Sequence, residues 1–181
     1  MTSGLDRKNM FQGELRMPLL RPVTVIALAT LMSCTAALPA NPPATCRVTL
    51  PPARPFVPPA RYPAKPRGEG SFWFGTAELW TRLKTDGTWR GLRTSSGYRE
   101  KTFWWREGYY WQADPTPNLK VSGRRLDAPA QPLVAPRTTN GHREDWKSFM
   151  VVRMDFPAPG CWEITGRFEE DSLTFVVWIA P

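Results

Sequence analysis

The sequence predicts an all-β fold, a two-sheet antiparallel sandwich of immunoglobulin-like type, on the basis of three observations. From Ser71 onward apolar and polar residues alternate, which is the period of a strand with one buried face. β-branched and aromatic residues dominate the alternating segments. Turn sequences such as Asp86-Gly87 and Glu169-Glu170-Asp171 separate them. Short strands joined in this way favour a sandwich, and a small barrel is the alternative.

The strands are expected at regular intervals between the turn sequences. They span residues 72–75, 78–84, 88–93, 101–106, 118–126, 148–156, 161–168 and 172–179. In the segment 148–156, Met150, Val152, Met154 and Phe156 share one face, which predicts a core-facing side. The last two strands form a hairpin after a Pro/Gly corner, and this ending is immunoglobulin-like. A weak helix candidate covers 143–150.

A two-residue turn at Asp86-Gly87 predicts a hairpin between 78–84 and 88–93. In this register the leucines share a core face, and the opposite face carries tryptophans beside cations. That face consists of Trp80, Arg82, Lys84, Trp89 and Arg93. Stacking of Arg or Lys on Trp contributes about 0.5–2 kcal/mol per pair.

These residues, together with Trp104 from the segment 101–106, form a candidate ligand platform. Exposed aromatic rings can stack on sugar rings, and cations attract anionic groups. The alternative interpretation is structural, because tryptophans can fill a core and Arg and Lys stems can cover a sheet. The exposure of Trp80, Trp89 and Trp104 distinguishes the two interpretations.

An export signal is expected over residues 1–33, with Met17 as an alternative start. Arg16 and Arg21 precede the apolar run 23–32. A membrane-spanning helix needs about 20 apolar residues, so this shorter run is typical of a signal peptide.

The apolar run ends in Leu31-Met32-Ser33-Cys34, which resembles the lipobox of bacterial lipoproteins. The resemblance implies that Cys34 carries the lipid and becomes the mature N-terminus. Thr35 stands where an Asp often signals inner-membrane retention, which favours the outer membrane in a diderm host. The alternative is an ordinary signal peptide that is cleaved near Ala37 or Ala40.

Prolines and tryptophans occupy different parts of the exported chain. Residues 34–70 are rich in proline, which fixes φ and lacks a hydrogen-bond donor, so the segment is expected to be a partly docked tether. All nine tryptophans follow, within the expected β domain 71–181.

Cys46 and Cys161 are expected to form a disulfide if Cys34 carries lipid. Such bonds persist outside the cytoplasm. Closing a loop of over 100 residues contributes roughly 4–5 kcal/mol in the chain-entropy model. Two separate buried thiols are the alternative. We expect no metal and no cofactor, because two cysteines and one histidine do not provide the ligand cluster of a zinc site.

The case for an enzyme depends on His142, the single histidine. A hydrolase in the envelope could use His142 with a nearby carboxylate such as Asp145 or Asp155. No serine lies in a Gly-x-Ser-x-Gly context, and the histidine lies in a polar loop. We therefore expect no catalytic residue, and the hydrolase stays as the alternative.

Several segments are similar to those of an uncharacterised group of exported bacterial β-domain proteins. They are Glu78-Leu79-Trp80 with Asp86-Gly87, Phe103-Trp104-Trp105-Arg106, Val121-Ser122-Gly123-Arg124-Arg125-Leu126-Asp127-Ala128-Pro129-Ala130, and Gly160-Cys161-Trp162-Glu163-Ile164-Thr165-Gly166-Arg167 followed by Ser172-Leu173-Thr174-Phe175-Val176. The resemblance covers most of residues 73–177. It implies a small exported β domain with a Cys pair, and it implies no activity.

The chain is basic, with 24 Lys and Arg against 16 Asp and Glu and a formal net charge of +8. A basic chain with aromatics often binds nucleic acid, but the export signal argues against that partner. We expect a monomeric, lipid-anchored envelope protein that binds or scaffolds without catalysis. Its expected partners are the membrane, through the lipid, and an envelope glycan or protein. A module whose loops inhibit a protease is a further interpretation that the sequence does not separate from this one.

Overall fold

The computed structural model describes residues 40–181, which belong to the compact unit Ala36–Pro181. Cys34 and the expected signal peptide lie outside the described residues. The described part has ten strands and no helix, so no helix there is long and apolar enough to cross a membrane. The strands are β1 (Ser71–Gly75), β2 (Trp80–Lys84), β3 (Thr88–Trp89), β4 (Arg93–Thr94), β5 (Gly97–Trp105), β6 (Lys120–Arg125), β7 (Thr139–Arg143), β8 (Lys147–Phe156), β9 (Gly160–Phe168) and β10 (Asp171–Ile179).

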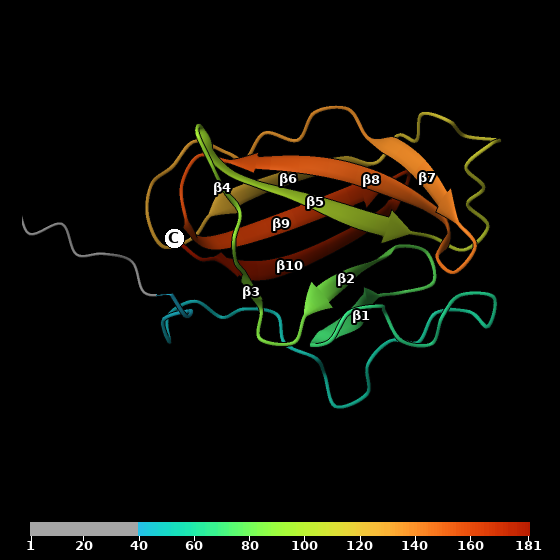
Figure 1. Cartoon of the computed structure of the whole chain (residues 1–181), viewed down its shortest axis with the longest axis horizontal. Coiled ribbons are helices and arrows are strands. Elements are labelled where there is room, and N and C mark those ends of the chain that lie inside the picture. Colours follow the sequence, from blue (N-terminus) through green and yellow to red (C-terminus); the bar gives the residue numbers. More distant parts are fainter. Residues whose placement is uncertain (1–39) are drawn as a thin grey trace, which may run out of the picture. The chain divides into compact units, whose positions relative to one another are not determined.

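The strands form two sheets whose arrangement is consistent with a sandwich (Figure 1). Sheet A has the order β1-β2-β5-β8-β7, with β4 also paired to β5, and sheet B has the order β3-β10-β9-β6. All pairs are antiparallel except β3 with β10, which are parallel. The predicted all-β class and most predicted strands are therefore confirmed.

The first core lies between the sheets and is built from the alternating residues. Met150, Val152, Met154 and Phe156 of β8 are buried, as their spacing predicts. Trp104 of β5 meets Phe175 of β10 with ring centres 5.8 Å apart.

A second aromatic core lies on the outer face of sheet A. Trp73, Trp80, Trp105 and Phe149 project there from β1, β2, β5 and β8. Adjacent Trp104 and Trp105 thus point to opposite faces of β5, as alternation along a strand requires.

The proline-rich segment covers this second core. We call residues 46–67 the proline strap. Phe56 and Tyr62 of the strap lie on Trp80, with ring centres 5.6 and 5.0 Å from its indole. The indole Nε1 of Trp73 donates to the carbonyl of Pro63 at 2.9 Å. Proline suits this position because the strap packs as a layer and forms no ladder with sheet A.

The start of the strap is fixed to sheet B. Cys46 forms a disulfide with Cys161 of β9, as predicted, with Cα atoms 5.7 Å apart. The N–H of Thr49 donates to the carbonyl of Val176 at 2.8 Å, and the Thr49 hydroxyl accepts from the Val176 N–H at 2.9 Å. Figure 1 shows the strap along one side of the domain, beneath β1 and β2.

Three local expectations need correction. The segment 88–93 is two short strands, and β2 pairs with β1 and β5 instead of returning as a hairpin. The chain leaves sheet A at Asp86, whose carboxylate accepts from the Thr88 N–H at 2.9 Å, and enters sheet B at β3. The segment 143–150 contains no helix: Arg143 ends the unexpected strand β7, residues 144–146 form a turn, and β8 follows.

Candidate functional site

The predicted tryptophan platform is wrong, because its three indoles are inside the protein. Trp80 and Trp104 are 0% exposed and Trp89 is 7% exposed. Trp80 lies under the proline strap, and Trp89 and Trp104 face the core between the sheets. The structural interpretation of the tryptophans is the correct one.

The two arginines of the predicted platform lie on different strands and do not form one surface with the tryptophans. Arg93 lies on the edge strand β4, exposed and paired through its backbone with Tyr98. Arg82 lies on β2, where its Nη1 donates to the carbonyl of Arg67 at 3.0 Å and its guanidinium carbon is 5.8 Å from the ring centre of Trp146.

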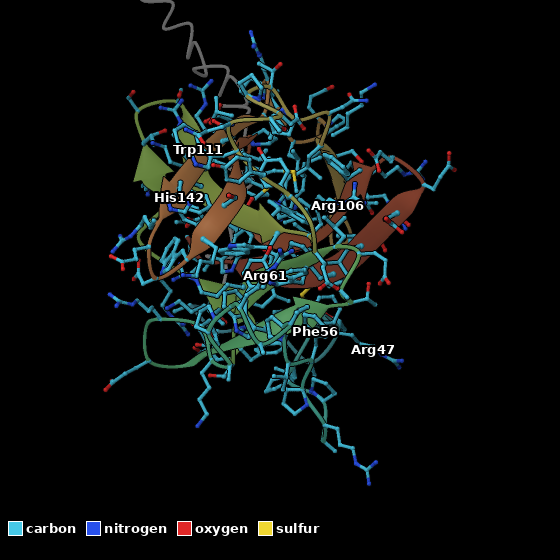
Figure 2. The ribbon with its side chains drawn as sticks, turned by 90° about the vertical axis from the view of Figure 1, so that its right-hand side faces the viewer. Arg47, Phe56, Arg61, Arg106, Trp111 and His142 are labelled. Carbon is cyan, nitrogen blue, oxygen red and sulfur yellow. A yellow bond between two sulfur atoms is a disulfide. The ribbon has the colours of Figure 1, made fainter. Side chains whose placement is uncertain are left out.

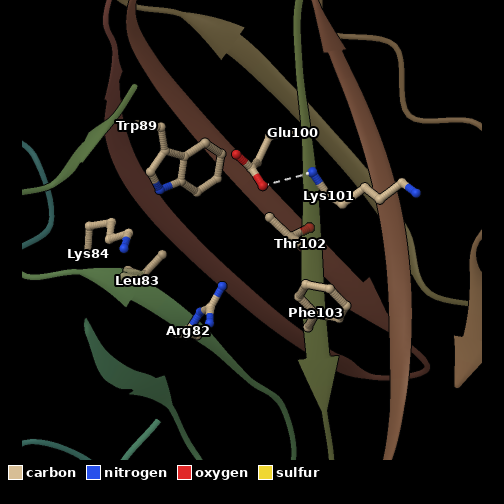
Figure 3. Close-up of a pocket in the computed structure, with 8 residues that line it drawn as sticks. All are labelled: Arg82, Leu83, Lys84, Trp89, Glu100, Lys101, Thr102 and Phe103. Atoms are coloured by element: carbon tan, nitrogen blue, oxygen red, sulfur yellow. Dashed lines mark hydrogen bonds between the residues drawn. The ribbon is translucent and has the colours of Figure 1, made fainter. Parts of the chain in front are cut away.

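A gap in sheet A brings a different set of residues together. On one side of β5, β4 pairs with Gly97 and Tyr98, and β2 pairs with Trp104 and Trp105. Residues 100–103 have no strand partner on that side. The gap holds a cavity of about 60 Å³, lined by Arg82, Leu83, Lys84, Trp89, Glu100, Lys101, Thr102 and Phe103 (Figure 3). A space of that size accommodates a few water molecules or one small ligand group.

Glu100 is the central group of this gap. It alternates with Tyr98, Thr102 and Trp104, so its carboxylate lies on the core-facing side of β5. Its Oε1 accepts from the N–H of Lys101 at 3.0 Å, in the stretch that lacks a strand partner. Figure 3 shows Glu100 beside Trp89, with the Lys101 side chain pointing the other way.

Burial raises the pKa of the Glu100 carboxyl above its ordinary value. The Lys101 N–H and the charges of Arg82 and Lys84 oppose that rise. A half-buried carboxylate with a perturbed pKa beside a cavity marks a candidate binding site.

A larger groove on the surface adjoins the cavity. The groove has a volume of about 470 Å³ and shares Lys84, Trp89 and Glu100 with the cavity. Its other walls include Glu69, Asp86 and Arg90. Positively and negatively charged side chains thus surround the groove, and Trp89 forms part of its wall.

His142 does not meet the requirements of the hydrolase hypothesis. It is exposed on β7, and its ring stacks on Trp111 with centres 6.1 Å apart, at the end of the domain away from Arg47 (Figure 2). Asp145 pairs instead with Arg67 and Arg143, at 2.8 and 3.2 Å.

Asp155, the second carboxylate proposed for His142, is also engaged by arginines. It pairs with Arg99 at 2.5 Å and with Arg153 at 3.1 Å. Within residues 40–181, no ion pair joins His142 to a carboxylate, and no group of three His, Cys, Asp or Glu side chains could hold a metal ion.

The sequence contains a signal for Glu100 that lies outside any catalytic motif. A carboxylate that interrupts the alternating face of Tyr98, Thr102 and Trp104 is unusual, because charged groups are rarely placed toward a core.

No family model, curated protein or solved structure matches the chain. The resemblance to exported β-domain proteins therefore stays a prediction.

Proposed function

We propose that the chain is an exported, lipid-anchored envelope protein that acts as a non-enzymatic binding or structural module with an immunoglobulin-like sandwich. The observation that carries this proposal is the Cys46–Cys161 disulfide. Such a bond forms and persists in oxidising compartments and is rare in the cytosol, which supports export. The ending β8, Pro/Gly corner and β9–β10 hairpin supports the immunoglobulin-like class.

Attachment through Cys34 is the testable part of the anchor. Cells expressing the chain should incorporate a palmitate analogue into the wild-type protein and should not do so in Cys34→Ala. Absence of label from the wild type would contradict the anchor, and so would equal label in both. Cys161→Ala is the control, because it removes a cysteine that the disulfide already engages and should leave the label unchanged.

An envelope glycan is the partner that we propose for the groove beside Glu100. Charged donors and acceptors suit the hydroxyl and carboxylate groups of a glycan, and the groove lies within the size range of small-ligand sites, about 300–1,000 Å³. Pulldown on purified peptidoglycan should weaken in Lys84→Ala combined with Arg90→Ala.

The matched control for the pulldown is Arg124→Ala combined with Arg167→Ala. Like Arg90, exposed Arg124 pairs with a carboxylate, and Arg167 is exposed and takes part in no ion pair of residues 40–181. Equal loss in both variants would indicate a general charge effect and contradict the groove. If peptidoglycan retains neither the wild type nor the variants, the glycan proposal for the groove is also contradicted. Co-purification of an envelope protein would then favour a protein partner.

The hydrolase alternative has less support. Asp145 and Asp155 are each held by two arginines, and the imidazole of His142 contacts Trp111. A general base needs a carboxylate or substrate within hydrogen-bond reach to be oriented and used.

A further inference from the structure

The proline strap carries an unusual distribution of charge. From residue 40 to residue 68 the chain has five basic residues and no acidic residue. All five are exposed, and they are Arg47, Arg54, Arg61, Lys65 and Arg67. Only Arg67 forms an ion pair within residues 40–181, with Asp145 at 2.8 Å. The strap therefore presents a positive surface with little internal neutralisation.

Elsewhere in the described domain, arginines are commonly neutralised by a neighbouring carboxylate. Arg99 pairs with Asp155, Arg124 with Glu163 and Arg125 with Asp127, at 2.5 to 2.8 Å. The contrast with Arg47, Arg54 and Lys65 indicates that the strap's charge is directed outward.

The strap also exposes large apolar side chains between its cations. Leu50 is 54% exposed and Val57 is 62% exposed, whereas most large apolar side chains of the two sheets are buried. Phe56, next to Val57, points inward onto Trp80, so neighbouring apolar side chains of the strap face the domain and the solvent. Figure 2 shows Phe56 and Arg47 toward the lower right of the view and Arg61 nearer its middle.

We propose that the proline strap is a docking surface for a lipid bilayer with anionic headgroups. Cations attract the headgroups, and exposed Leu50 and Val57 can enter the interface between headgroups and acyl chains. The chain before residue 40 supports this occupant, because it contains the apolar run 23–32 and Cys34, and Cys34 precedes the first residue of the strap by only 12 positions. The inference extends the proposed anchored function, but its charge argument does not depend on lipidation.

Vesicle binding of the unlipidated 181-residue chain tests the proposal. Vesicles of phosphatidylcholine with about a third phosphatidylglycerol are compared with pure phosphatidylcholine, so that the N-terminal apolar run is common to both. Each cation close to an anionic surface strengthens binding about fivefold. The combined variant Arg47→Gln, Arg54→Gln and Lys65→Gln should therefore lose roughly a hundredfold of the preference for anionic vesicles.

The matched control removes three exposed cations outside the strap: Lys120→Gln, Arg137→Gln and Arg167→Gln. This control should lose less than about fivefold of the preference for anionic vesicles, because its changes lie away from the proposed contact. Equal losses in the two variants would overturn the proposal, as would a wild type without preference for anionic vesicles. Salt should weaken the wild-type preference, since the Debye length falls from about 10 Å at 0.1 M to about 3 Å at 1 M.

Limited trypsin digestion of the wild type gives a second readout that needs no variant. Anionic vesicles should slow cleavage after Arg47 and Arg61 and should leave cleavage after Arg137 unchanged. Equal cleavage after Arg47 and Arg61 with and without vesicles would contradict the docking even if the chain sediments with them. Protection by dextran sulfate without protection by vesicles would assign the surface to an anionic glycan and overturn the bilayer proposal.

Discussion

The ring of Tyr62 packs edge-on against the indole of Trp80, with ring centres 5.0 Å apart and planes at 85°. This contact joins the proline strap to sheet A. The Tyr62 hydroxyl also donates to the carbonyl of Arg106 at 3.1 Å. The prolines and tryptophans that are separate in the sequence are therefore packed together in the fold.

Removal of the Tyr62 ring should destabilise the whole domain. Tyr62→Ala is expected to lower the free energy of unfolding by about 3–5 kcal/mol, as for other buried aromatic rings. Tyr62→Phe should cost only about 1 kcal/mol, because it removes the hydrogen bond and keeps the ring. Urea unfolding measures both. Tyr110→Ala, at a ring that is 53% exposed, is the control, and equal effects at the two positions would refute a docked strap.

The disulfide should provide much of the stability of the strap. Cys46 and Cys161 are separated by 115 positions, so their replacement by Ala should lower the free energy of unfolding by about 4–5 kcal/mol. Alkylation in denaturant before reduction, followed by peptide mapping, should leave both cysteines unlabelled, whereas buried free thiols would react once the chain is unfolded. Labelling of either cysteine under these conditions would count against the bond.

Glu100 should make stability depend on pH. Its folded pKa is raised by burial, so its stabilising contribution is complete below the unfolded pKa of about 4.3 and is lost as pH rises through the folded pKa. Glu100→Gln keeps an acceptor for the Lys101 N–H and removes the titration. Its stability relative to the wild type should therefore increase as pH rises from about 4.

Urea unfolding of both proteins across that pH range gives the comparison. Glu170→Gln, at an exposed turn residue, is the control and should show no comparable trend. A constant difference between Glu100→Gln and the wild type, or one that falls as pH rises, would show that Glu100 is not desolvated in the folded chain.

A side chain at Gly166 should destabilise the fold. A Cβ at this position of β9 would lie 2.5 Å from ring atoms of Trp104 on the opposing sheet. Gly166→Ala should cost about 1–3 kcal/mol in thermal or urea unfolding, because the sheets must separate or the indole must leave its rotamer. An unchanged midpoint would mean that the two sheets do not approach each other at this point.

The all-β class and the disulfide could be predicted because local patterns carry them. The alternation of Met150, Val152 and Met154 requires one buried face wherever the strand lies. The hairpin at Asp86-Gly87 could not be predicted reliably, because β2 finds its partners in β1 and β5. Pairing between more distant strands therefore determined the position of β2, although the local sequence favours a hairpin turn.

The platform failed for a related reason. Alternation correctly placed Trp80 and Arg82 on the outer face of β2, but it could not show that a proline-rich segment covers that face. The prolines have no regular spacing that would identify a buried face, so the packing of the strap on sheet A could not be inferred from them. The gap around Glu100 likewise depends on where β2 and β4 end against β5, which no local pattern specifies.

Nuclear Overhauser effects between the rings of Tyr62 and Trp80 test the packed strap most directly. With ring centres 5.0 Å apart, the account predicts strong cross-peaks between their ring protons and upfield-shifted Tyr62 resonances in the native protein. Tyr62 signals at unfolded-chain positions, without cross-peaks to Trp80, would contradict it and leave residues 46–67 as a free tether.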